Sequence, residues 1–168
     1  DCVSLGKTAK IILPAELTKV SDGMFKGCTS LPWVLIHDNI KSIGKESFSG
    51  CSATGFNKMS IPSSVTSVGS NAFNGCTSLA TVSFAVSGCS KLADYVFANC
   101  TALTTISLPT TAFTSIGSNA FENCVNLTTI TIPSSVTSIG SAAFKGCKSL
   151  NKVTLTTNSS FKTIDDQL

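Results

Sequence analysis

The side chains best suited to chemistry in this sequence are eight cysteines and a single histidine. In a small secreted chain so many cysteines usually form disulfides, and cysteine and histidine clustered in nearby loops can hold zinc. Here, however, most of the cysteines are evenly spaced. Six of them recur at intervals of 23, 25, 24, 24 and 23 residues: Cys28, Cys51, Cys76, Cys100, Cys124 and Cys147. Such spacing gives one ligand per structural repeat instead of a tetrahedron, so we expect no metal site and no cofactor.

The same spacing indicates a buried column of thiols. Each of these cysteines ends a short motif, Phe-x-Gly/Asn-Cys, and so occupies an equivalent position in a repeat. If neighbouring repeats stack like parallel strands, successive thiols lie about 5 Å apart, which makes a disulfide geometrically conceivable. Free cysteine is nevertheless among the most buried residue types. We favour burial, with bridging as the open alternative.

The remaining polar residues suggest no catalytic site. His37 stands where other repeats have a strand-ending proline, and we interpret it as a turn residue. The acidic residues form no pair in register that suits acid–base catalysis, and the glycines follow the repeat instead of a phosphate-binding motif. We therefore predict that the protein is not an enzyme.

Two stretches of the chain are nearly the same. Residues 61–79 and 132–150 are identical at 15 of 19 positions, and the differences fall mainly at polar positions while the apolar ones are kept. This pattern is typical of a repeat protein in which each repeat forms one stacked coil with a shared core.

Within one repeat the pattern predicts a strand, two turns and a brief helix. Segments such as 103–108 alternate apolar and hydroxyl residues, as a short strand does. A proline then ends the pairing, a glycine allows a bend, and we expect a short helical turn around the Ala-Phe pair. After Cys51 the repeat is two residues longer, which predicts a bulged loop near Thr54 and Gly55.

The resulting consensus is Leu-x-x-Val/Ile-x-Ile/Leu-Pro-x-x-Val-x-x-Ile-Gly-x-x-Ala-Phe-x-Gly/Asn-Cys. It resembles the BspA-like leucine-rich repeats over about residues 10–164. The resemblance implies an α/β leucine-rich-repeat solenoid, with a short-stranded parallel sheet on the concave face and turns or short helices on the convex face. It also implies a cell-surface or secreted protein, since the family includes adhesins. We expect residues 1–168 to form one solenoid of about six full repeats plus partial terminal repeats, as a fragment of a longer protein.

Charge and hydropathy exclude two kinds of partner. The net charge of +3 comes from 12 lysines and no arginine, whereas nucleic-acid binding relies heavily on arginine. Nearly every phenylalanine falls on an apolar position of the repeat, where it cannot stack on bases. No apolar run approaches the length of a membrane span. We therefore expect no nucleic-acid binding and no membrane insertion by this segment.

Function must then reside on a surface, and the concave sheet is the best candidate. Residues between the apolar strand positions should face solvent there, because side chains alternate across a strand. One outward column is Lys10, Trp33, Lys58, Thr81, Thr105, Thr129 and Lys152; the other is Ile12, Leu35, Ser60, Ser83, Ser107, Thr131 and Thr154.

Within these columns the middle is an array of hydroxyls, and the N-terminal end is apolar. Trp33, Leu35 and Ile12 would form an exposed apolar cluster flanked by Lys10 and Lys58, which resembles a binding hot spot. A loop or a partner chain that caps the end of the solenoid is the alternative explanation.

Two functions remain open at this stage. The first is a non-enzymatic adhesion or protein-binding module that uses the concave face to bind an extracellular protein or a matrix ligand. The second is a structural building block whose copies assemble into a filament or surface layer. Sequons at Asn99, Asn126 and Asn158 are further candidates for modification, although a chain rich in Ser and Thr generates sequons by chance.

Overall fold

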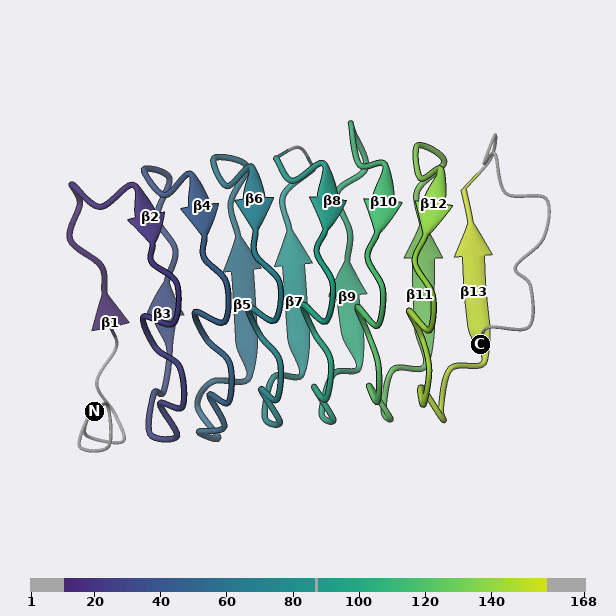
Figure 1. The fold of residues 1–168 in the computed structure, drawn as a ribbon, viewed down its shortest axis with the longest axis horizontal. Coiled ribbons are helices and arrows are strands. Elements are labelled where there is room, and N and C mark those ends of the chain that lie inside the picture. Colours follow the sequence, from purple (N-terminus) through teal and green to yellow (C-terminus); the bar gives the residue numbers. More distant parts are fainter. Residues whose placement is uncertain (1–10, 87, 157–168) are drawn as a thin grey trace.

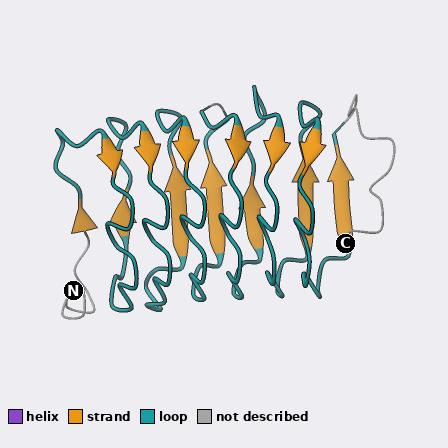
Figure 2. Ribbon diagram, viewed as in Figure 1, coloured by secondary structure: helices purple, strands orange, loops and turns teal. Residues whose placement is uncertain are grey.

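The chain winds into a stack of similar coils (Figure 1). The computed structural model describes residues 11–86 and 88–156, and the predictions made for Lys10 and Asn158 lie outside these ranges. Figure 1 shows the coils side by side along the long axis, and Figure 2 shows that strands and loops make up each of them. We number the coils 1 to 6 by their motif phenylalanines, which are Phe25, Phe48, Phe73, Phe97, Phe121 and Phe144.

The expected parallel sheet runs along one side of the solenoid, and we call it the long-strand sheet. Its ladders are β1–β3, β5–β7–β9 and β11–β13. Ile61 pairs with Phe84, so the two extra residues of coil 2 are absorbed in the loop before β5, as predicted. The strands are β1 (Ile11–Ile12), β3 (Val34–Leu35), β5 (Lys58–Ile61), β7 (Thr81–Phe84), β9 (Thr105–Ser107), β11 (Thr129–Ile132) and β13 (Lys152–Leu155).

A second column of short parallel strands, the short-strand sheet, was not expected from the sequence. Each strand has two residues, and the ladders are β2–β4–β6 and β8–β10–β12. In each coil, one of these short strands lies just before the bend that precedes the Phe-x-Gly/Asn-Cys motif. They are β2 (Lys19–Val20), β4 (Ser42–Ile43), β6 (Ser67–Val68), β8 (Lys91–Leu92), β10 (Ser115–Ile116) and β12 (Ser138–Ile139).

The glycine that follows four of the six short strands, β4, β6, β10 and β12, lets neighbouring coils approach closely. A Cβ atom added to Gly69 would lie 2.6 Å from the backbone nitrogen of Lys45, and one added to Gly140 would lie 2.4 Å from that of Ser118. Coil 4 has Ala93 at this position. The ladder is interrupted between β6 and β8, at the coil that carries this alanine.

The predicted helical turn around Ala-Phe is wrong, because the described residues contain no helix. The backbone turns to the left-handed region two residues before each motif phenylalanine and again two residues after it. Around Phe73, for example, Asn71 has φ of 58° and Gly75 has φ of 72°. A right-handed helix cannot continue through such residues. The fold is therefore a β-solenoid of the leucine-rich-repeat type, without the α component that we expected.

Hydrogen bonds between coils replace the helix. In coil 3 the N–H groups of Asn71, Phe73 and Gly75 donate to carbonyls of coil 4 at 3.1, 2.9 and 2.8 Å. The alternate N–H groups close tight turns inside the coil, as Cys76 does by donating to the Phe73 carbonyl at 3.1 Å. The same arrangement joins each of the five pairs of neighbouring coils, so the backbone groups of the buried turn are satisfied.

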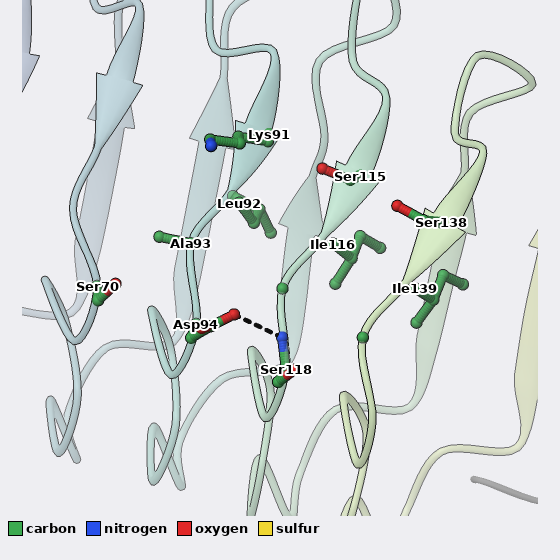
Figure 3. Close-up of a pocket in the computed structure, with 12 residues that line it drawn as sticks. Ser70, Lys91, Leu92, Ala93, Asp94, Ser115, Ile116, Ser118, Ser138 and Ile139 are labelled. Atoms are coloured by element: carbon green, nitrogen blue, oxygen red, sulfur yellow. Dashed lines mark hydrogen bonds between the residues drawn. The ribbon is translucent and has the colours of Figure 1, made fainter.

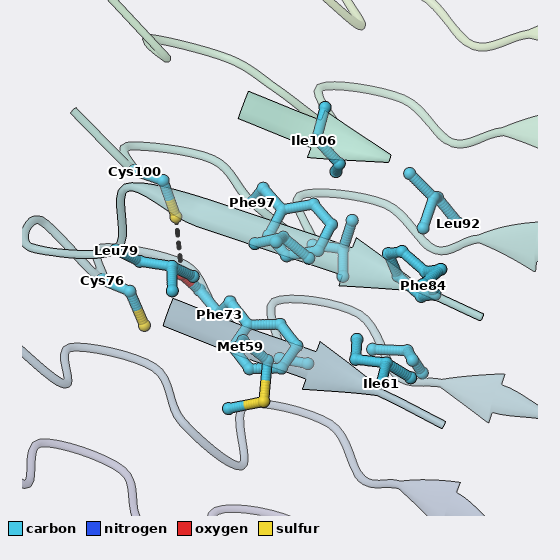
Figure 4. Packing of buried hydrophobic residues seen from close by; sticks show 14 of the residues in the cluster. Met59, Ile61, Phe73, Cys76, Leu79, Phe84, Leu92, Phe97, Cys100 and Ile106 are labelled. Carbon is cyan, nitrogen blue, oxygen red and sulfur yellow. Dashed lines mark hydrogen bonds between the residues drawn. The ribbon is translucent and has the colours of Figure 1, made fainter. Parts of the chain in front are cut away.

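Stacked aromatic rings fill the core behind these turns. The motif rings lie nearly parallel along the stack, with centroids 5.2 Å apart for Phe48 and Phe73 and 5.3 Å apart for Phe73 and Phe97. Apolar side chains of both sheets pack around them (Figure 4), so that Leu79 and Met59 are buried beside the Phe73 ring. Offset stacking adds to the free energy that burial of the rings supplies.

The packing predicts the stability cost of losing one ring. Phe121 is fully buried and stacks on a ring on each side. Phe121→Ala should lower the free energy of unfolding by about 3–5 kcal/mol, as for other buried aromatic residues. Urea unfolding measures this value, with Thr105→Ala on the solvent face as a control that changes it by less than about 0.5 kcal/mol. A loss below about 1 kcal/mol for Phe121→Ala would contradict the assignment of this ring to the core.

Candidate functional site

The column of motif thiols is structural. Each thiol donates to the carbonyl of the motif phenylalanine one coil earlier, with Sγ to O distances of 3.0–3.2 Å for Cys51, Cys76, Cys100, Cys124 and Cys147. All five are free, as is Cys89. Burial raises the pKa of Cys51 to about 12 and that of Cys147 to about 11. A thiol that stays protonated is a poor nucleophile and a poor metal ligand.

Cys28 is buried like most of the other motif cysteines, but here the alternative that the sequence left open, a disulfide, applies. Cys28 is disulfide-bonded, and its partner is not among the described residues.

The geometry around His37 supports its interpretation as a turn residue. The backbone N–H of Asn39 donates to Nδ1 at 3.3 Å, and Nε2 lies 3.1 Å from the carbonyl oxygen of Pro14 in the preceding coil. Nδ1 therefore accepts while the protonated Nε2 donates. Nε2 thus ties this turn to the preceding coil, and Nδ1 stabilises the turn itself.

The described residues form neither a metal-binding cluster nor a membrane-spanning helix. Across residues 11–86 and 88–156, no three His, Cys, Asp or Glu side chains are placed to hold a metal ion. The same part of the chain has no helix long and apolar enough to cross a bilayer.

The N-terminal end of the long-strand sheet carries an apolar surface. Ile12 and Leu35 are paired in register on β1 and β3, and their exposed fractions are 66% and 38%. Trp33 lies two residues before Leu35, and it is half-buried instead of fully exposed. Lys58 is exposed on β5. We call Ile12 and Leu35 the apolar pair.

Further along the same sheet, the outward face consists of hydroxyl groups. Thr81 pairs with Thr105 in register, and Ser83 pairs with Ser107. Thr105 and Thr129 are exposed, whereas Thr81 is half-buried. The apolar pair therefore lies at one end of this face and the hydroxyls lie in its middle.

A hollow over β8, β10 and β12 was not among the sites expected from the sequence. Figure 3 shows Lys91, Ser115 and Ser138 along one side and Asp94 and Ser118 along the other. The hollow measures about 370 Å³ and has the two glycines of coils 5 and 6 among its lining residues. Its carboxylate is already engaged, since Asp94 Oδ1 accepts from the Ser118 N–H at 2.8 Å. The small residues that allow close packing of the coils are the signal that could have revealed it.

Two of the three sequon asparagines lie at exposed turns. The Asn99 side chain donates to Asn74 Oδ1 at 3.1 Å and accepts from Asn123 Nδ2 at 3.0 Å, forming an amide ladder across three coils. Asn126 Nδ2 donates to the carbonyl of Thr101 at 2.8 Å. Glycosylation of these asparagines stays a prediction, and a glycan on either amide nitrogen would replace one of its hydrogens.

Sequence comparison agrees with the architecture. The description "BspA type Leucine rich repeat region (6 copies)" matches residues 3–111 and 52–168, which together include nearly the whole chain. The chain belongs to the BspA-type leucine-rich-repeat family. No curated protein matches it.

Solved structures of bacterial leucine-rich-repeat proteins share the fold. One from Eubacterium ventriosum is 28% identical with a TM-score of 0.63, over 94% of this chain and 46% of that one. One from Bacteroides ovatus is 24% identical with a TM-score of 0.59, over 86% of this chain and 48% of that one. This BspA-type chain thus spans about half the length of these two proteins.

The buried thiols predict how stability depends on pH. In the folded protein the pKa of Cys51 is raised from the ordinary value of 9.0 to about 12 and that of Cys89 to about 11, chiefly because burial disfavours the thiolate. In the unfolded chain these thiols ionise near pH 9, so the unfolded state gains an advantage above that pH. Stability should be level up to about pH 8 and then fall by about 1.4 kcal/mol per pH unit for each such thiol.

Urea unfolding between pH 7 and pH 10 measures this dependence. Cys51→Ala removes one ionising thiol, so the variant should be less stable at pH 7 but should lose stability less steeply above pH 9. Equal slopes for the two proteins would contradict the burial of a free thiol at position 51.

Proposed function

We propose that this chain is a non-enzymatic recognition module of a cell-surface or secreted protein. It binds an extracellular protein or a matrix ligand through the N-terminal end of the long-strand sheet. Leucine-rich-repeat modules generally mediate protein binding, which supports this role for a member of the BspA-type family. The localisation rests on the same family membership.

The apolar pair is the observation that carries the proposal. Four large hydrophobic side chains are exposed among the described residues, and two of them, Ile12 and Leu35, are direct neighbours on paired strands. The other two, Val86 and Tyr95, lie apart from them in coil 4. Adjacent exposed apolar side chains on a rigid sheet suit a binding hot spot, because their burial by a partner releases water without ordering a loop.

The charge around the pair gives the surface a polar rim. Lys58 extends from β5 on the same outward column as Trp33, and the half-buried indole offers further apolar area beside Leu35. An apolar centre with a charged margin is the usual anatomy of a protein interface.

A second copy of the chain is the alternative occupant of this surface. The same exposed pair could face its equivalent in another molecule, which would make the chain a building block of a filament or surface layer. The two functions predict different oligomeric states for the purified protein in solution.

The test replaces the apolar pair. Ile12→Ser combined with Leu35→Ser should weaken binding to purified matrix and serum proteins, screened by surface plasmon resonance, by roughly thirtyfold, the effect of losing about 2 kcal/mol at a hot spot. Val86→Ser combined with Tyr95→Ser removes equally exposed apolar groups elsewhere and should leave binding unchanged.

Light scattering after size exclusion separates the two occupants. The recognition role predicts a monomer before and after the substitutions. An oligomer that dissociates into monomers when Ile12→Ser and Leu35→Ser are introduced would instead establish self-assembly. Full binding by the doubly substituted protein would show that the apolar pair is not the site.

A further inference from the structure

Tyr95 is a bulky residue in a backbone conformation that bulky residues rarely adopt. Its φ is 55°, and coils 3 and 5 have Asn71 and Asn119 at this left-handed position, which asparagine tolerates far better. Tyr95 is 39% exposed, and its hydroxyl has no hydrogen-bond partner among residues 11–86 and 88–156. The fold thus gains no polar contact from this side chain, and strained residues of this kind cluster at binding sites.

The amide ladder of Asn74, Asn99 and Asn123 lies beside Tyr95. Asn74 joins the two features, because its side chain donates to Asn71 Oδ1 at 2.8 Å and accepts from Asn99 Nδ2 at 3.1 Å. Tyr95 takes the position of Asn71 in the next coil. The tyrosine and the ladder therefore share one side of the solenoid, along the motif segments that follow β6, β8 and β10 (Figure 1). We call Tyr95 and the amide ladder the amide ridge.

The amides of this ridge keep hydrogen-bonding capacity for a ligand. A side-chain amide has two N–H donors and two acceptor lone pairs. Within the ladder Asn99 uses one of each, since it donates to Asn74 and accepts from Asn123 Nδ2 at 3.0 Å. Asn99 and Asn123 are both exposed. The ladder also fixes the orientation of these groups, so a ligand that binds them orders few side chains.

The amide ridge has little net charge around it. From position 70 to position 126 the chain has only three charged residues, Lys91, Asp94 and Glu122. Lys91 and Asp94 lie on opposite sides of the hollow (Figure 3). Glu122 is 3.3 Å from the Lys145 ammonium and accepts from Asn119 Nδ2 at 3.1 Å. A neutral, hydroxyl-rich ligand suits this surface better than a polyanion or a cation.

We propose that the amide ridge binds a neutral, extended oligosaccharide. One sugar ring packs its C–H face on the Tyr95 ring, whose body is apolar and whose hydroxyl is polar. Hydroxyl groups of the neighbouring sugars exchange hydrogen bonds with the remaining amide atoms of Asn99 and Asn123. Neighbouring coils are spaced like parallel strands, about 4.8 Å apart. A β-1,4-linked hexose chain advances by a similar length per ring, so successive sugars follow successive coils.

This site goes beyond the proposed protein-binding surface and is separate from it. The amide ridge lies in coils 3 to 5, with a coil on each side, whereas Ile12 and Leu35 belong to coils 1 and 2. Ile12→Ser with Leu35→Ser should therefore leave oligosaccharide binding unchanged. Val86→Ser with Tyr95→Ser should weaken oligosaccharide binding and keep the binding of a protein at the apolar pair. Failure at one surface is thus measured independently of the other.

Isothermal titration calorimetry with cellotetraose and chitotetraose tests the proposal, on the chain produced without glycans in a bacterial host. At least one of these two extended tetrasaccharides should bind, and maltotetraose, whose α-linkages curve the chain, should bind more weakly. Tyr95→Asn introduces the residue that coils 3 and 5 have at this position. It should weaken binding by about tenfold, as expected for the loss of one stacked ring, without lowering the Tm. Tyr95→Phe keeps the ring and should bind like the unaltered protein.

Asn99→Gly tests the ladder in the same way. Coils 1, 2, 3 and 6 have glycine at this left-handed position, so the backbone tolerates the change. The variant lacks the middle amide and should also bind the tetrasaccharide more weakly. Val86→Ser, which alters the other exposed apolar residue of coil 4, is the control and should bind normally.

Four results would overturn the proposal. Binding of neither extended tetrasaccharide would exclude the ligand class. Unchanged affinity in Tyr95→Asn and Asn99→Gly would place binding elsewhere on the chain. An equal loss in Val86→Ser would show non-specific apolar contact, and a Tm lowered by Tyr95→Asn would show that the tyrosine serves the fold.

Discussion

The fold depends on a single backbone constraint, the return to left-handed conformation on both sides of each motif phenylalanine. Asn71 and Gly75 illustrate it in coil 3, with φ of 58° and 72°. Because these residues block a helix, the N–H groups between them face the next coil and bond to it. The stacking of coils is therefore fixed by the backbone, and the side chains fill the space that this spacing leaves.

The motif cysteine follows from the same geometry. The carbonyl of each motif phenylalanine accepts from the backbone N–H of the cysteine in its own coil, and its second lone pair is left for another donor in the core. A thiol is small enough to fit between coils and donates to that carbonyl, as Cys100 does to Phe73 at 3.1 Å. Motif rings and motif thiols thus form two columns along the axis, and both are buried from coil 1 to coil 5. The free motif thiols serve this fold as hydrogen-bond donors to the backbone.

Much of this arrangement could be predicted from the sequence. The spacing of the motif predicted the coils, the long strands, their outward-facing positions and the insertion before β5, because the period of the apolar residues indicates which side chains are buried. The prediction of a helical turn was wrong because alanine favours a helix more than any other residue does, while the left-handed positions are obvious only where Gly or Asn occupies them. Glu46, Tyr95 and Ala142 adopt the same conformation without such a signal. The short strands were not predicted because two residues are too few to show an alternation of apolar and polar side chains. The disulfide at Cys28 was not predicted because this cysteine occupies the same motif position as the five free ones.

The central claim concerns the bond from each motif phenylalanine to the next coil, and a scalar coupling across that hydrogen bond measures it directly by NMR. The account predicts a coupling between the amide nitrogen of Phe73 and the carbonyl carbon of Val96, whose oxygen lies 2.9 Å from that nitrogen. A coupling from Phe73 to the carbonyl of Gly69, four residues earlier in the same coil, would reveal an α-helical turn and contradict it.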